Sequence, residues 1–234
     1  MGAALARRLS REGYVLALVA RRKDLLTSLC SDINNINHET TALPYVHDVG
    51  DYDNVPDLLR RIVSDLGGLD LVVYAAGVNF PPKPDEYNFD ADRKMIEINL
   101  LGAFAWLNPI SALFQSAKSG IIIGISSVAG DRGRVGNPGY NTSKAALTTY
   151  LEALRNRLTR HGVNVITVKP GFVQTDMLKA AQTVMFPITV DKAADDIWRA
   201  IRARKQQIYT PWFWSWIMLV IRNIPSLLFR RMSF

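Results

Sequence analysis

The feature that most constrains the fold of this chain is a series of short apolar runs, separated by stretches long enough to form helices. The most continuous runs are residues 14–20, 69–74, 120–125 and 163–168. An apolar run of this length is typical of a β-strand buried on both faces, which is how strands lie in a parallel sheet. We therefore predict strands in these runs, at 42–46 and near 207–210.

Helices are predicted between these strands. They are expected at 2–12, after the first strand to about residue 36, from near 53, across 91–117 and from 140 to about 160. Strands that alternate with helices form a doubly wound α/β fold with a parallel sheet, a Rossmann-like architecture. Ligands bind such sheets at the carboxyl ends of the strands, so the residues that follow each run are the candidates for function.

The size and composition suit one compact domain. The chain has 234 residues, of which 48% are hydrophobic and 21% charged, which is enough for a single core. We expect a domain over residues 1–210 and an apolar, arginine-flanked tail over 211–234. A single cysteine, Cys30, and the lack of a leader pattern favour a cytoplasmic location, and the tail favours the inner face of the membrane. No metal site is predicted.

The formal charge of +7 indicates an anionic partner. Nucleic acid, anionic lipid and a phosphorylated small molecule all carry suitable charge. No nucleic-acid motif accompanies the basic residues, so no nucleic-acid binding is expected. If DNA were the partner, the chain would be retained on DNA in a strongly salt-dependent way.

Tyr140 and Lys144 are the strongest candidates for chemistry. They are four residues apart at the start of a predicted helix, so their side chains share one face. A phenol has a pKa near about 10, and a fixed cation nearby lowers it toward the range useful for proton transfer. Ser127 follows a predicted strand, where its hydroxyl can donate a hydrogen bond to a carbonyl oxygen. Alone, such a Tyr and Lys would more often be a solvated pair.

The joint pattern changes that interpretation. Asn99 lies in Glu97–Gly102. Residues 170–175, with the sequence Pro-Gly-Phe-Val-Gln-Thr, follow a predicted strand. With Ser127, Tyr140 and Lys144, this set resembles the short-chain dehydrogenase/reductase family, and the resemblance extends from residue 2 to about 177.

The resemblance implies a role for each residue. Tyr140 would be the general acid, Lys144 would lower its pKa and hold the nicotinamide ribose, and Ser127 would orient the substrate carbonyl. Asn99 would hold a relay water, although an asparagine inside a helix also bonds backbone groups. The nicotinamide carboxamide would be positioned by Pro170, Val173 and Thr175.

The same resemblance implies a coenzyme site. Arg21 and Arg22 follow Ala20, where NAD-dependent relatives carry an acidic residue, so NADP(H) is expected in preference to NAD(H). A solvated helix start is the alternative. The adenine would be met by Asp48 and Val49, although an isolated aspartate there is more often a helix cap. Small residues at Ala75 and Gly77 would admit the adenosine ribose.

Gly2 looks like the last glycine of the family's Thr-Gly-x-x-x-Gly-x-Gly loop, which holds pyrophosphate at a helix N-terminus. The first strand and the earlier glycines of that loop do not precede it. We expect a misassigned start or a natural truncation. The absent strand is central in this fold, so the ladder groups of its two neighbours are expected to be exposed.

Two further segments bear on the substrate. Residues 130–139 are predicted to form one wall of the substrate pocket, where Arg132 and Arg134 would meet an anionic group or simply be solvated. The tail holds an uncharged, tryptophan-rich run at 211–221, too short to span a bilayer and suited to an interfacial helix on anionic lipid. Packing of the tail on the domain or on a second subunit is the alternative.

Both segments resemble those of the reductases that act on decaprenylphosphoryl 2-keto-pentose. The resemblance implies a lipid-linked keto-sugar as substrate, and the long helices at 91–117 and 140–160 imply a homo-oligomer. We therefore predict NADPH-dependent reduction of a ketone at the membrane surface. The alternative is a non-catalytic, membrane-associated protein of the same fold that has lost coenzyme binding.

Overall fold

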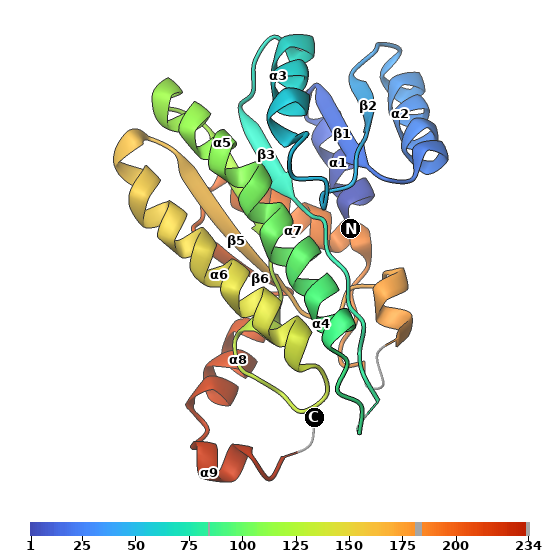
Figure 1. The fold of residues 1–234 in the computed structure, drawn as a ribbon. Helices are drawn as coiled ribbons and strands as arrows, with labels where there is room; N and C mark the ends of the chain where they lie inside the picture. Colours follow the sequence, from blue (N-terminus) through green and yellow to red (C-terminus); the bar gives the residue numbers. More distant parts are fainter. Residues whose placement is uncertain (84, 181–183, 233–234) are drawn as a thin grey trace.

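The computed structural model describes residues 1–83, 85–180 and 184–232, and it shows parallel strands covered by helices on both faces (Figure 1). The strands are β1 (Leu16–Ala20), β2 (Ala42–Val46), β3 (Leu71–Tyr74), β4 (Ile121–Ile125), β5 (Asn164–Pro170) and β6 (Gln207–Thr210). The longer helices are α1 (Gly2–Arg11), α2 (Lys23–Asn37), α3 (Val55–Leu66), α4 (Phe89–Ile96), α5 (Gly102–Ala117), α6 (Pro138–Leu158), α7 (Val190–Arg202) and α8 (Trp214–Asn223). The predicted Rossmann-like α/β class is thereby confirmed.

The strands form two separate parallel sheets. One contains β1 and β2, and the other has the order β3-β4-β5-β6. Within the described residues no ladder joins β1 to β3. The parallel sheet is therefore divided between β1 and β3. The side chains of β1 and β3 are mostly half-buried, whereas those of β4 and β5 are almost all buried.

The continuous apolar runs are explained by a core on each face of the sheet. Ile122 and Val165 point into a cluster formed with α3, α5 and α6. Their neighbours Ile123 and Ile166 point to the other face, into a cluster formed with α1, α2 and α7. Side chains alternate along a strand, so a strand covered on both faces must be apolar at every position.

The helix predicted over 91–117 is interrupted by a π-helical segment, Glu97–Leu101, between α4 and α5. Two carbonyls of this segment also accept hydrogen bonds from tyrosine side chains. Tyr52 donates its hydroxyl to the Glu97 carbonyl at 3.0 Å, and Tyr74 donates to the Ile98 carbonyl at 2.6 Å. Gly102 follows the segment, and its lack of a side chain leaves room for Tyr74, because a Cβ there would lie 2.5 Å from the Tyr74 hydroxyl. The segment therefore depends on its tertiary neighbours.

Residues 89–117 are also long and apolar enough to cross a membrane, judged by length and composition alone. However, Ala103, Leu107 and Phe114 are completely buried in the core cluster on their face of the sheet. This pattern is that of a core helix.

The tail packs against the domain through one face only. Trp214 and Met218 of α8 are buried against Val128, which lies just after β4. Trp216 and Val220, on the opposite face of the same helix, are 62% and 65% exposed. A short helix, α9 (Ser226–Phe229), follows. The structure thus supports the alternative of packing on the domain for the inner face of the tail and leaves its outer face available.

Candidate active site

The predicted catalytic residues come together where the N-terminus of α6 meets the carboxyl end of β4. The start of α6 is fixed locally, because the Asn137 side chain accepts a hydrogen bond from the Tyr140 amide at 3.2 Å and Pro138 occupies the first turn. Asparagine caps and first-turn prolines favour helix starts at such positions. Tyr140 therefore lies in the first turn, and Lys144 lies one turn further along the same face.

Lys144 is buried at the end of β4. Its Nζ donates a hydrogen bond to the Ile125 carbonyl at 2.9 Å and lies 5.7 Å from the centre of the Tyr140 ring. Burial lowers the pKa of Lys144 to about 8. The ammonium is therefore held close to the point at which it exchanges its proton near neutral pH.

Two other groups act on the phenol of Tyr140. Burial raises the pKa of Tyr140, while a hydrogen bond with the Ser127 side chain and the positive charge of Arg134 lower it. The pairing of Tyr140 with Ser127 agrees with their predicted partnership. The sequence predicted an anionic substrate or solvent as the contact of Arg134, because nothing in its position indicates proximity to Tyr140.

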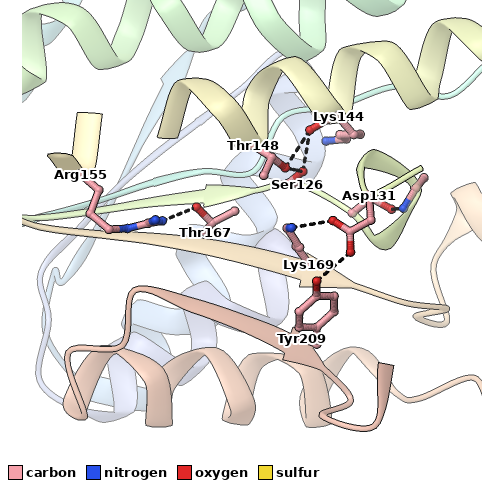
Figure 2. A network of polar contacts seen from close by, with 10 residues as sticks. Ser126, Asp131, Lys144, Thr148, Arg155, Thr167, Lys169 and Tyr209 are labelled. Atoms are coloured by element: carbon pink, nitrogen blue, oxygen red, sulfur yellow. Dashed lines mark hydrogen bonds and ion pairs between the residues drawn. The ribbon is translucent and has the colours of Figure 1, made fainter. Parts of the chain in front are cut away.

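Ser127 and Ser126 connect β4 to α6 and to the loop that follows. The Ser127 hydroxyl accepts a hydrogen bond from the Ala129 amide at 3.1 Å and thereby starts a short 3-10 turn. The Ser126 hydroxyl lies 2.9 Å from the Lys144 carbonyl and 2.7 Å from the Thr148 hydroxyl (Figure 2). These bonds fix α6 against the strand and so fix the distance between Ser127 and Tyr140.

Asn99 holds the chain that follows β3. Its Oδ1 accepts from the Val78 amide at 2.8 Å, and its Nδ2 donates to the Val78 carbonyl and the Ser143 hydroxyl, both at 3.0 Å. The structure therefore shows the backbone-bonding role, and the relay water stays a prediction. A Cβ on Gly77 would lie 3.3 Å from both the Asn99 Oδ1 and the Lys144 Nζ. A side chain at this position would make a tight contact with both polar groups.

The residues predicted to bind the adenosine half of a coenzyme lie beyond β1, β2 and β3. Arg21 and Asp48 form an ion pair, with Nη1 and Oδ2 3.6 Å apart and both side chains about half exposed. A hydrogen bond from the Gly50 amide, followed by the charge of Arg21, lowers the pKa of Asp48. Arg22 precedes α2 and is exposed, and Val49 packs beside Gly102.

Gly2 begins α1 next to the end of β3, where a Cβ on Gly2 would lie 3.7 Å from the Ala75 Cβ. The first amides of a helix have no partner inside the helix and favour an anion such as pyrophosphate. The unpaired amides at the start of α1, the small residues Ala75 and Gly77 and the cations of Arg21 and Arg22 are chemically suited to a phosphorylated dinucleotide.

The residues predicted to hold the carboxamide of nicotinamide follow β5. Pro170 is the last residue of that strand, and the Trp214 indole lies against the backbone of Gly171, where a Cβ would collide with it. Val173 is buried and pairs with Ile188 in an isolated bridge. Thr175 donates its hydroxyl to the Val173 carbonyl at 3.3 Å.

Arg132 does not have either role considered from the sequence. Its guanidinium donates to the carbonyls of Ile221 and Arg222 at 3.3 and 2.7 Å, and it lies 4.3 Å from the centre of the Phe229 ring. It is therefore bound to the tail instead of facing a substrate. The helix ends that it contacts are far away in the sequence, so no local pattern could have revealed this partner.

Comparison with known proteins agrees with this arrangement. A model of the short chain dehydrogenase family matches residues 1–184. An uncharacterized oxidoreductase of Mycobacterium tuberculosis is 28% identical over 236 residues, covering 100% of this chain and 93% of the relative. The NADP-dependent 3-hydroxy acid dehydrogenase of Schizosaccharomyces pombe is 28% identical over 162 residues, covering 69% of this chain and 62% of the relative.

Solved structures share the fold. The alcohol dehydrogenase of the archaeon Thermococcus sibiricus, complexed with 5-hydroxy-NADP, has a TM-score of 0.80 at 22% identity and covers 89% of this chain and 90% of that chain. The actinorhodin polyketide ketoreductase with NADPH has the same TM-score, identity and coverage. An NAD+-bound xylitol dehydrogenase has a TM-score of 0.71 at 27% identity and covers 76% of this chain and 68% of that chain.

The burial of Lys144 predicts a measurable dependence of stability on pH. Its pKa falls from 10.5 to about 8 on folding, so between these values the unfolded chain binds more protons than the native state. The free energy of unfolding must then gain a contribution as pH rises through this window, about 2 kcal/mol between pH 8 and 9.5. Urea unfolding of the wild type and Lys144→Met at pH 7 and 9.5 measures it. An equal change in the free energy of unfolding of the two proteins between pH 7 and 9.5 would contradict the burial of the Lys144 charge.

Proposed function

The chain belongs to the short-chain dehydrogenase family and is an oxidoreductase, and on this premise we propose that it reduces a ketone to an alcohol with NADPH. The observation that carries the proposal is the placement of Tyr140. Its phenol is hydrogen-bonded to Ser127, with the cation of Arg134 acting on it and the ammonium of Lys144 beside its ring.

Each of these side chains has a task in ketone reduction. NADPH, when bound, supplies the hydride. The Ser127 hydroxyl orients the carbonyl oxygen, and the Tyr140 hydroxyl donates the proton to that oxygen as negative charge develops on it. Arg134 and Lys144 then stabilise the tyrosinate that remains. Lys144, whose Nζ lies beside Gly77, would also hold the nicotinamide ribose.

The coenzyme preference rests on the residues after β1. No acidic residue stands directly at the end of that strand, and Arg21 and Arg22 are exposed there. Asp48 takes only one nitrogen of Arg21, so the rest of the guanidinium is available for a 2′-phosphate. The Schizosaccharomyces pombe relative is named as NADP-dependent, which supports NADP(H) over NAD(H).

The substrate class that fits the site best is an anionic ketone. Within the described part of the chain, the partly buried guanidinium of Arg134 has no carboxylate partner, and it acts electrostatically on Tyr140. A partly desolvated cation without a counterion favours an anionic ligand, and a phosphate suits the fork of a guanidinium. The substrate phosphate would therefore lie close to the reacting carbonyl.

The tail supports a lipid-linked form of that substrate. Trp216 and Val220 are exposed on one face of α8, Trp212 is exposed just before that helix, and Leu227 and Leu228 are exposed in α9. Arg230 and Arg231 are exposed beside them. Aromatic and apolar side chains flanked by arginine suit the surface of an anionic bilayer. A lipid-linked keto-sugar would leave its chain in the bilayer and present its phosphate and ketone to Arg134 and Tyr140.

Removal of one hydroxyl tests the reaction. Tyr140→Phe is expected to lower kcat with NADPH and a ketone by about 10²- to 10⁴-fold, because the proton donor is lost. NADPH binding, followed by fluorescence titration, should change by less than about twofold, since the ring remains in place. In the wild type, KM for NADPH should lie below KM for NADH.

Tyr150→Phe provides a matched control, because that hydroxyl lies on the same helix and bonds Asn108 instead of a catalytic group. It should keep wild-type turnover. Full activity in Tyr140→Phe would rule the mechanism out. Absence of any NADPH binding by the wild type would favour the non-catalytic alternative, which the divided sheet between β1 and β3 keeps under consideration.

The anionic substrate class makes a separate prediction. Arg134→Gln should raise KM for a phosphorylated ketone by about 10- to 100-fold, and KM for a neutral ketone of the same length by less than about twofold. Steady-state kinetics with the two substrates measures the difference. Arg134→Lys should recover part of the loss, since it keeps the charge without the fork. An equal increase in KM for the two substrates would contradict anion recognition by Arg134.

The lipid surface is tested by vesicle sedimentation. Trp212→Ala/Trp216→Ala should bind phosphatidylglycerol vesicles at least about 10-fold more weakly than the wild type, because two interfacial aromatic anchors are lost. The double variant Leu25→Ala/Ile36→Ala removes exposed apolar side chains from α2, at the far end of the molecule from α8, and should bind like the wild type (Figure 1). Wild-type binding by the tryptophan variant would contradict the assigned surface.

A further inference from the structure

We propose that Asp131 and Arg132 are positioning residues that lock the catalytic segment beginning at Ser127 between the sheet and the tail. The two residues are consecutive and bind on different sides. Asp131 is held by the ends of β5 and β6, and Arg132 is held by α8 and α9. This inference rests on the proposed reductase activity. It means that contacts with the tail help to hold the catalytic segment in position.

Asp131 is the centre of a buried polar cluster (Figure 2). Its Oδ1 lies 2.5 Å from the Nζ of Lys169, and the two side chains are only 2% and 4% exposed. Its Oδ2 accepts a hydrogen bond from the Tyr209 hydroxyl at 2.7 Å. Both carboxylate oxygens are thus occupied by protein donors. A buried carboxylate satisfied in this way has a single well-defined position.

This cluster lies between two segments of the active site. Asp131 follows the short 3-10 turn that starts at Ser127, and Lys169 directly precedes Pro170, where the predicted nicotinamide turn begins. The Asp131 to Lys169 pair therefore ties the loop after β4 to the loop after β5. The substrate carbonyl and the nicotinamide must meet between these loops, so a fixed separation between them favours hydride transfer.

Arg132 extends the same lock to the tail. Its contacts with the Ile221 and Arg222 carbonyls satisfy the C-terminal end of α8, where helix carbonyls have no internal partner. The Arg222 side chain also reaches the Tyr209 hydroxyl. The last turn of α8 is thus connected to the Asp131 cluster at two points. Trp214 of the same helix packs against Gly171, so α8 braces both active-site loops.

A charged cluster of this kind contributes little to stability overall, because desolvation of the charges offsets their attraction. Its effect is expected in geometry instead. Misplacement of catalytic groups by about 1 Å lowers turnover by up to about 100-fold, so small shifts of Ser127 are sufficient to be seen in kcat.

The test combines kinetics with hydrogen exchange on the full-length chain. Arg132→Ala and Tyr209→Phe are expected to lower kcat for a neutral soluble ketone by about 10-fold and to leave KM for NADPH within about twofold. Amides of residues 128–137 should exchange faster in both variants, while the urea midpoint stays close to that of the wild type. Asp131→Asn/Lys169→Met, which removes both charges together, should show the same pattern without leaving a lone buried charge.

Arg204→Ala is the matched control. Arg204 also donates to a backbone carbonyl, that of Gly162 at 3.2 Å, but it lies at the opposite end of β5 from the site. It should keep wild-type exchange in 128–137 and wild-type kcat.

Unchanged exchange in 128–137, or faster exchange with unchanged kcat, would overturn the proposal. A wild type that reduces no carbonyl would instead contradict the reductase function, and the exchange measurement would still report whether Asp131 and Arg132 hold the loop.

Discussion

The buried ammonium of Lys144 is the constraint on which the rest of the site depends. It lies at the end of β4, bonded to the Ile125 carbonyl, with the ring of Tyr140 and the backbone of Gly77 beside it. A charge is brought out of water only where polar groups surround it. The strand end, the first turns of α6 and the chain after β3 must therefore all converge on one point, and the candidate active site is that point.

The local distortions of the structure serve this convergence. The π-helical segment carries Asn99, whose side chain bonds both backbone polar groups of Val78, and Tyr52 and Tyr74 donate to two carbonyls of the segment. On the other side of the site, Asp131 and Arg132 connect the loop after β4 to the sheet and to α8. The sheet is divided between β1 and β3, near the residues predicted to bind the coenzyme, whereas β4 and β5, next to the predicted proton-transfer residues, are almost completely buried.

Much of the architecture was predictable from local patterns. All six strands were predicted, four of them from continuous apolar runs, and each end agrees with the structure to within two residues. The spacing of Tyr140 and Lys144 indicated their shared face. The helix α7 was missed, although Ala193, Ala194, Ile197 and Ile201 show the helical spacing of a buried face. The roles of the cofactor residues and the relay role of Asn99 stay predictions.

The sequence by itself determined the class of fold and the shared face of Tyr140 and Lys144, because strand burial and helical spacing depend on residues that are close along the chain. The candidate catalytic set was indicated by a family pattern that the sequence carries. Only the tertiary structure decided the partners of Arg132, the closeness of Arg134 to Tyr140 and the one-sided packing of α8. The partners of Arg132 are about ninety residues away from it, and contacts over such separations are set by how whole elements pack. An arginine in a glycine-rich loop has the same local pattern whether it contacts a helix end, a substrate or water.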